Sequence, residues 1–357
     1  MRPCIVIFAI LIAFAWLDGY AQTKNPMDSE VALILGSFYP DKYQGVLVAG
    51  GKSPAIDELL VLAKGGDKKA QHVMGMVYTL IAFRCCEKSE KDRNKFEAAA
   101  AALFQASANQ GLLDSMRMLA HAYQSGKGVE RDEKKAIDWF ERAAASDDWL
   151  SLESLGDMAY EGKNGFSKDK EHSARYYEKA AELGGWTAQL KIGRMYEDGD
   201  GVPQDYQRAM RWYVKCYEEY RVGLEARTRI GNLYLKGLGV PVDPVSAYAW
   251  YLSALKMKLS VDSRNRKEAN KALKQLQRSL TREQIAEARA YKFPNGEQYV
   301  GEWKGDKYHG QGTYLWPDGR NYVGEWKNDE PDGRGMMTFA DGRVKSGQWQ
   351  SGKFVGP

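Results

Sequence analysis

The sequence predicts a mainly α-helical protein, an α-solenoid of helix-pair repeats followed by a small all-β sheet of stacked hairpins. Two internal repeats carry this prediction. Up to residue 255, an Asp recurs at intervals of 37, 36 and 38 residues, and a pair of aromatic residues follows each Asp after seven residues. From Phe293 onward the period changes to 23 residues, with Gly and Trp in register. Such repeats are typical of units that must stack to bury their apolar faces.

Residues 1–21 have the pattern of a secretory signal peptide. Arg2 precedes thirteen apolar residues, Ile5 to Leu17, and the small residues Gly19 and Ala21 precede the expected cleavage before Gln22. Thirteen apolar residues are too few to cross a bilayer, which disfavours the alternative of an uncleaved anchor, and no later segment is apolar enough to span a membrane. We therefore expect an exported chain, periplasmic or secreted, and the pairing of a signal peptide with these repeats favours a bacterial source.

Composition and charge exclude several classes of protein. Apolar residues make up 44% of the chain and charged residues 27%, which is typical of a folded, soluble protein. The net charge is +4, but residues 256–290 alone carry +6 and residues 291–357 carry zero. A general nucleic-acid binder would spread its excess positive charge over a binding face, so we expect no nucleic-acid partner.

The cysteines do not suggest a disulfide framework. Cleavage removes Cys4 and leaves three, Cys85, Cys86 and Cys216. Adjacent cysteines bridge each other only with strain, so Cys85 and Cys86 are poor partners for one another. Whether either of them forms a disulfide with another thiol stays open.

Residues 22–65 are expected to form an N-terminal cap segment. Its last part predicts a short helix from Pro54 to Ala63, because Ser53 is a favourable N-cap and proline is favoured at the first helical position.

Each unit of the longer repeat predicts two helices, here called helix A and helix B. Helix A carries a small residue that lets a neighbouring helix approach closely. Helix B starts after an Asp that serves as N-cap, and its aromatic pair fills the space between units. The small residues are Ala120, Gly156, Gly193 and Gly231, the N-caps are Asp132, Asp169, Asp205 and Asp243, and the aromatic pairs are Trp139-Phe140, Tyr176-Tyr177, Trp212-Tyr213 and Trp250-Tyr251.

The motifs LGDMAYEGKNG and IGRMYEDGDGVPQDYQRAMRWY resemble the Sel-one-like repeat, a relative of the tetratricopeptide repeat. The resemblance covers residues 66–255, with an atypical first unit between Asp67 and Gln110. It implies an adaptor that binds other proteins, and this agrees with the long concave surface that a solenoid presents.

Residues 291–357 predict a sheet of hairpins. The columns Gly296, Gly319 and Gly342 and Trp303, Trp326 and Trp349 stay in register, and Tyr-x-Gly-x-Trp alternates with the period of a strand. The motif YVGEWKGDKYHGQG resembles the MORN repeat (membrane occupation and recognition nexus). The third unit has Lys345 in place of the first Tyr. We expect the helix from Thr281 to Ala290 to pack on the first hairpin, since only Tyr291 and Lys292 separate them.

The chain carries no recognisable catalytic or metal-binding motif. Its four histidines, His72, His121, His172 and His309, fall in different units, and no group of residues has zinc-ligand spacing. Cys216 occupies a column otherwise filled by alanine, which indicates a small core residue. Some cysteine-rich Sel-one-like proteins are described as β-lactam hydrolases, but this chain lacks their paired cysteines. We therefore expect no enzyme activity, no cofactor and no metal.

The helix A face is the candidate surface for a protein partner. One column follows the small core residue by one position, and two further basic residues lie three positions before two of its members, on the same face. If helix A lines the concave side, as in related repeats, these side chains contact the partner. The candidate residues are His121, Asp157, Lys191, Arg194, Arg229 and Asn232.

Residues 256–290 predict basic capping helices. Five cations recur at steps of three and four and so share one helix face, whereas Ala269, Ala272, Leu276 and Leu280 share another. The plain interpretation is a solvated face. The alternative is an anionic surface of the cell envelope, lipid or glycan, bound by this helix and the MORN sheet. The candidate residues are Arg264, Lys267, Lys271, Lys274 and Arg278.

Overall fold

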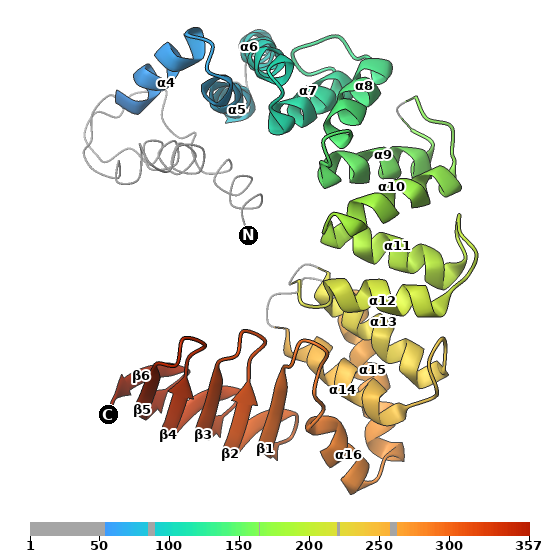
Figure 1. Cartoon of the computed structure of the whole chain (residues 1–357), viewed down its shortest axis with the longest axis vertical. Coiled ribbons are helices and arrows are strands. Elements are labelled where there is room, and N and C mark those ends of the chain that lie inside the picture. The colour runs from blue at the N-terminus through green and yellow to red at the C-terminus, as the bar shows by residue number, and fades with distance from the viewer. Residues whose placement is uncertain (1–53, 85–89, 164, 220–221, 258–262) are drawn as a thin grey trace. The chain divides into compact units, whose positions relative to one another are not determined.

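A computed structural model describes residues 54–84, 90–163, 165–219, 222–257 and 263–357 (Figure 1). These residues form thirteen helices, α4 to α16, and six strands, β1 to β6. The signal peptide, most of the cap segment 22–65, and Cys85 and Cys86 lie outside the described residues. The chain divides into two compact units between Gly185 and Trp186, within the predicted helical array.

The first unit is helical throughout its described residues. Its first helix confirms the expected helix from Pro54 to Ala63 to within one residue. Asp132 and Asp169 cap α8 and α10, each by accepting a hydrogen bond from the backbone N–H three residues on. The helices are α4 (Pro54–Lys64), α5 (Lys68–Arg84), α6 (Glu90–Asn109), α7 (Leu113–Ser125), α8 (Glu133–Ala144), α9 (Trp149–Glu161) and α10 (Lys170–Glu182).

The second unit joins two more helix pairs, two capping helices and the sheet. Asp205 and Asp243 cap α12 and α14 as predicted. Thr281 and Gln284 form a capping box at the start of α16. The helices are α11 (Trp186–Asp198), α12 (Tyr206–Cys216), α13 (Gly223–Lys236), α14 (Pro244–Lys256), α15 (Ser263–Ser279) and α16 (Arg282–Arg289).

The small residue of helix A packs against the second aromatic residue of helix B in the same unit. A Cβ atom added to Gly193 would lie 2.6 Å from Cε1 of Tyr213, and one added to Gly156 would lie 2.7 Å from the ring of Tyr177. These approaches are closer than a side chain permits, so glycine is required for the helices to meet. Cys216 is fully buried, as expected of a core residue, and burial raises the pKa of its thiol to about 12.

The C-terminal sheet is an antiparallel meander in the order β1-β2-β3-β4-β5-β6. Glycines lie opposite one another across the strands, Gly301 beside Gly312 and Gly312 beside Gly324. The ring of Tyr299 lies against Gly312, and the indole of Trp326 donates to the Gly312 carbonyl over 3.1 Å. The strands are β1 (Gln298–Lys304), β2 (Lys307–Leu315), β3 (Asn321–Lys327), β4 (Glu330–Thr338), β5 (Val344–Gln350) and β6 (Lys353–Gly356).

The sheet and the last helices share a continuous core. Trp303 of β1 packs against the sheet cluster around Tyr322 and also against the helical cluster that includes Ala288 of α16. Arg289 donates from Nη2 to the Gly305 carbonyl at 2.7 Å, which fixes the β1–β2 turn against the end of α16. The expected packing of this helix on the first hairpin is therefore confirmed.

Candidate functional site

The column of predicted partner-binding residues lies against the aromatic side chains of helix B. Asp157 accepts a hydrogen bond from the Tyr177 hydroxyl at 2.5 Å, and Asn232 accepts one from the Tyr251 hydroxyl at 2.6 Å. Burial raises the pKa of both tyrosines, so both remain donors at neutral pH. The column therefore has a structural role in these units, which is to satisfy a buried phenol.

His121 has no tyrosine hydroxyl to bond, because helix B of its unit has Phe140 at the position of Tyr177 and Tyr251. Its ring meets Phe140 edge-on, with 5.0 Å between centroids, and its Nδ1 lies 3.2 Å from Oε1 of Gln124. Although part of the side chain is exposed, desolvation lowers the pKa of His121, and the hydrogen bond with Gln124 opposes this shift. His121 is therefore a neutral aromatic side chain at pH 7. Asp157, at the matching position of the next repeat, is instead a hydrogen-bond acceptor.

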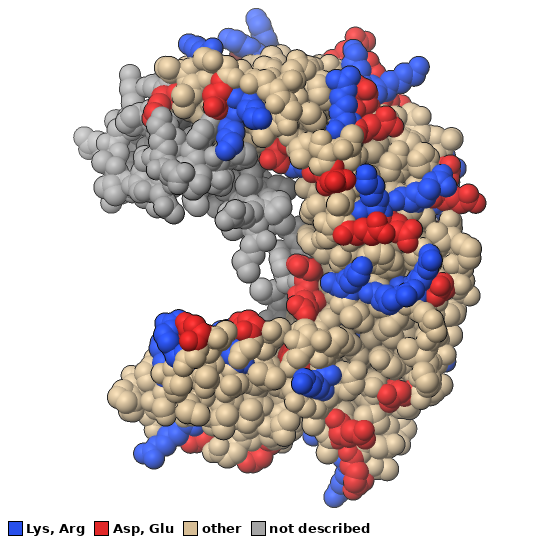
Figure 2. Space-filling view, in the orientation of Figure 1, with Lys and Arg blue, Asp and Glu red and all other residues tan. Residues whose placement is uncertain are grey.

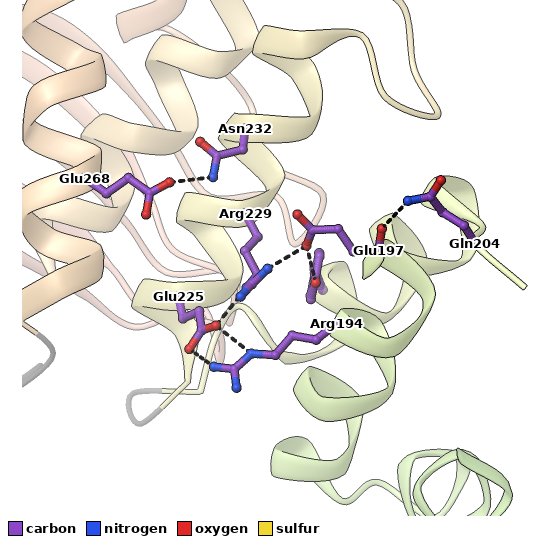
Figure 3. A network of polar contacts seen from close by, with 8 residues as sticks. Arg194, Glu197, Gln204, Glu225, Arg229, Asn232 and Glu268 are labelled. Atoms are coloured by element: carbon purple, nitrogen blue, oxygen red, sulfur yellow. Dashed lines mark hydrogen bonds and ion pairs between the residues drawn. The ribbon is translucent and has the colours of Figure 1, made fainter. Parts of the chain in front are cut away.

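Arg194 and Arg229 converge on one carboxylate (Figure 3). Glu225 of α13 accepts two hydrogen bonds from the Arg194 guanidinium, one of them from Nε at 2.7 Å. Arg229 donates to the same Glu225 over 2.7 Å and to Glu197 over 2.8 Å. Glu197 in turn accepts from the Tyr213 hydroxyl at 2.5 Å. Two arginines and two glutamates thus form a charge-neutral network that joins α11 to α13.

Part of this network remains open to solvent. The Arg194 side chain is 41% exposed, whereas that of Glu225 is 11% exposed. The contacts of Arg194 in the described residues use Nε and Nη2, so its Nη1 is available to a partner's acceptor. Asn232 is held on its other side by Glu268 of α15 at 2.9 Å, and Lys191 is half-buried on the same face of α11. Contact of the six candidate residues with a partner stays a prediction.

Sequence reasoning missed Glu197 and Glu225. Neither glutamate recurs at the same offset in the other three units. The positions that match Glu197 are Gln124, Tyr160 and Leu235, and those that match Glu225 are Asp114, Leu150 and Thr187. No periodic signal therefore marks them.

The first unit contains an apolar recess that the sequence did not indicate. This α5–α7 recess has a volume of about 710 Å³, and His121 lines it. Phe83, at the C-terminal end of α5, lies at its edge and is 61% exposed. Its apolar lining comes from all three helices and comprises Leu80, Phe83, Ala100, Ala101, Phe104, Met118 and Ala122, and its polar lining includes Arg93, Glu97 and Lys127.

The basic residues of α15 form an exposed stripe, as predicted. Arg264, Lys267, Lys271, Lys274 and Arg278 are all exposed, whereas Ala269, Ala272 and Leu276 are buried against α14 and α16. On the face that Figure 2 shows, by contrast, Lys and Arg side chains lie beside Asp and Glu along the helices. The basic stripe therefore differs from the mixed charge of that face.

In the described residues, the side chains that could hold a metal ion are those of His, Cys, Asp and Glu. Within these ranges no group of three or more His, Cys, Asp or Glu side chains is arranged to hold a metal ion. His72 is buried, and its Nδ1 lies 2.8 Å from the Ser115 hydroxyl. None of the helices in the described ranges combines the length and the apolar character needed to cross a membrane.

Comparison with known protein families identifies both repeats. The Sel1 repeat model matches residues 113–148, 150–185, 186–217 and 224–258, and the MORN repeat model matches residues 299–319 and 322–342. The chain therefore contains four Sel1 repeats, followed by two MORN repeats. Sel1 repeats typically serve as scaffolds for protein interaction and are generally not catalytic.

The solved structures that are similar to this chain include two with TM-scores of 0.50 or above. One is a protective antigen of uropathogenic Escherichia coli strains with an SLR fold, at 25% identity and a TM-score of 0.52 over 74% of this chain. This chain spans only 53% of that antigen's length. The other is a Sel1 repeat protein from Oxalobacter formigenes, at 21% identity and a TM-score of 0.50, covering 70% of this chain and 98% of the other. No curated protein matches the sequence.

Proposed function

We propose that this protein is an exported, non-enzymatic scaffold that binds a partner protein through its helical-repeat surface. The observation that carries the proposal is the exposed Phe83 beside the α5–α7 recess. A large aromatic side chain at the edge of an apolar recess is the usual anchor of a protein–protein interface, because its burial on binding is strongly favourable. His121, one of the predicted partner-binding residues, lines the same recess.

Site-specific photocrosslinking in the native cell tests this proposal. A photoreactive amino acid is placed at Phe83 and, as a matched control, at Val242, which is 63% exposed in the loop before α14. The proposal predicts one dominant crosslinked protein at position 83 that is absent at position 242. Equal patterns at both positions would show that the recess has no dedicated partner.

Export is supported by the signal-peptide pattern of residues 1–21. The expected mature protein begins at Gln22 and is periplasmic or secreted. Edman sequencing of the protein recovered from the envelope and the medium tests this, and a chain that still begins at Met1 would contradict it.

The absence of enzyme activity is tested on the reaction ascribed to cysteine-rich Sel-one-like proteins. No β-lactam turnover above a heat-denatured control is expected at high protein concentration, because the chain lacks the paired cysteines that those proteins carry in each repeat.

The basic stripe of α15 favours a second candidate function, contact with an anionic envelope surface. Its five cations are exposed along one face, and exposed cations attract the phosphate groups of an anionic surface. Co-sedimentation with vesicles of phosphatidylglycerol, compared with phosphatidylcholine vesicles, tests this candidate. Replacement of Lys267 and Lys274 by Glu should abolish the preference for phosphatidylglycerol vesicles. Equal binding of the unmodified protein to both kinds of vesicle would contradict a role for charge.

A further inference from the structure

A second recess lies between α16 and the first strand of the sheet. This α16–β1 recess has a volume of about 660 Å³. Arg282 and Arg289 of α16 both line it, and they are seven residues apart, so they lie on one helix face about 10 Å from each other. Between them on that face are the apolar side chains of Ile285 and Ala286, and Val300 of β1 lies opposite.

The two arginines have donors that the described part of the chain does not satisfy. Arg282 is exposed and makes no ion pair or hydrogen bond within those residues. Arg289 uses Nη2 for the Gly305 carbonyl and for Asp306, while its Nε is buried and has no acceptor. The hydrogen bonds of Arg289 within the described residues use Nη2, so its Nη1 and the Arg282 guanidinium are the donors that an incoming carboxylate can reach. The recess therefore favours anions.

The charges around the recess point the same way. Asp306 is the acid that faces Arg289, and it also accepts hydrogen bonds from Gln277 of α15. Glu283 and Glu287 of α16 are exposed and do not line the recess. Arg278 of the basic stripe adjoins Gln277, which itself lines the recess. The charged side chains that line the recess are therefore both cations, Arg282 and Arg289, and they attract a negatively charged ligand.

We propose that the α16–β1 recess binds an acidic segment of the partner protein, in which two carboxylate side chains flank an apolar one. This inference rests on the proposed function, since it supposes a protein partner. In an extended peptide the residues i, i+2 and i+4 face one side, and the outer two are about 13 Å apart. That spacing lets the outer carboxylates reach Arg282 and Arg289, with the central apolar side chain on Ile285 and Ala286. The wall of Trp303 and Tyr299 closes the other side.

Saturation-transfer NMR on the full chain tests the proposal with three peptides. The probe contains Glu-Ser-Leu-Ser-Glu, and two controls replace both Glu by Gln or the Leu by Ser. Only the probe should show strong transfer to its Leu methyl groups. Binding of the Gln peptide with equal strength would overturn the proposal, because the arginines would then have no role.

Three variants separate the recess from the general positive charge of α15. Arg282→Gln removes a cation without internal contacts and should weaken probe binding about three- to tenfold. Arg278→Gln removes an exposed cation outside the recess and should change the affinity for the probe less than twofold. Ala286→Phe keeps every charge but fills the recess, and it should abolish binding. Equal effects of Arg282→Gln and Arg278→Gln, or unchanged binding by Ala286→Phe, would overturn the proposal.

The same variants distinguish a lipid from a protein ligand. If Arg282→Gln and Ala286→Phe reduced sedimentation with phosphatidylglycerol vesicles but left peptide binding unchanged, the recess would be a lipid site and the proposal would be wrong. The crosslinking experiment at Phe83 concerns another recess, in the first unit. A partner captured there, with no peptide binding here, would retain the proposed function and reject this inference alone.

Discussion

Lys256, in the last turn of α14, forms an ion pair with Asp329 in the turn between β3 and β4. The Lys256 ammonium also lies 3.6 Å from the centre of the Tyr308 ring and 5.0 Å from that of Trp303. Asp329 accepts a second hydrogen bond from the Tyr308 backbone N–H at 2.9 Å. One lysine of the helical array thus contacts the second MORN hairpin through an ion pair and the first through two aromatic rings.

Replacement of Lys256 by Met should reduce the free energy of unfolding by about 1–3 kcal/mol, because it leaves Asp329 half-buried without its cation. Urea denaturation checks this value. A double-mutant cycle with Asp329→Asn should give a favourable coupling energy, and Lys274→Met, on the exposed stripe, is the matched control. A coupling energy of zero would mean that the ion pair does not join the sheet to the helices.

Gly193→Ala should destabilise the second unit by about 1–3 kcal/mol, in spite of the higher helix propensity of alanine. The new Cβ would lie 2.6 Å from the ring of Tyr213, which is fully buried and cannot move aside. Thermal unfolding followed by circular dichroism checks this, with the exposed Gln207→Ala as control. A raised melting temperature for Gly193→Ala would show that the close helix approach is not needed.

Glu225→Gln should lower the free energy of unfolding by about 1–3 kcal/mol, since it removes the negative charge that Arg194 and Arg229 share. The same change at the exposed Glu218 should alter stability by less than about 0.5 kcal/mol. Equilibrium unfolding of the two variants provides the comparison. Equal effects would show that the network in Figure 3 contributes nothing beyond ordinary surface charge.

Stability should fall in mild acid because of His72. Burial lowers the pKa of His72 from 6.5 to about 4, while Asp114 opposes the shift and Arg117 adds to it. Between pH 6.5 and about 4, His72 binds a proton in the unfolded chain but not in the folded chain. The contribution of neutral His72 to the free energy of unfolding is therefore complete above pH 6.5 and is lost as the pH falls towards 4. The loss is at most about 3 kcal/mol.

The slope of unfolding free energy against pH isolates this effect. His72→Gln removes the titrating group and retains the carboxylates that also titrate in this range. Its slope between pH 6.5 and 4 should be shallower than that of the unmodified protein. Parallel slopes would mean that His72 takes up its proton without unfolding.

Much of the fold could be predicted because repeats report the same local physics several times. Asp132, Asp169, Asp205 and Asp243 are all N-caps, as their common offset from the aromatic pairs indicated. The 23-residue period predicted the hairpins, since Gly residues that recur with this period lie opposite one another on paired strands.

The candidate sites could be predicted only in part. The exposed stripe of α15 follows from helical periodicity. The pairing of Arg194 with Glu225 joins different repeats, and neither residue recurs at its offset in the other Sel1 repeats, so no periodic pattern predicts it. Likewise the α5–α7 recess depends on how three helices pack, and Phe83 would otherwise count as a core residue of an apolar helix.

The central claim, that this protein binds a partner protein through the repeat surface, is tested most directly by the affinity of the crosslinked partner once it is purified. Calorimetry should show that Phe83→Ser raises the Kd about thirtyfold or more, as expected of an aromatic anchor. Val242→Ser, which removes an equally exposed apolar side chain, should change the Kd less than twofold. An unchanged Kd for Phe83→Ser, or the same loss for both variants, would contradict the account.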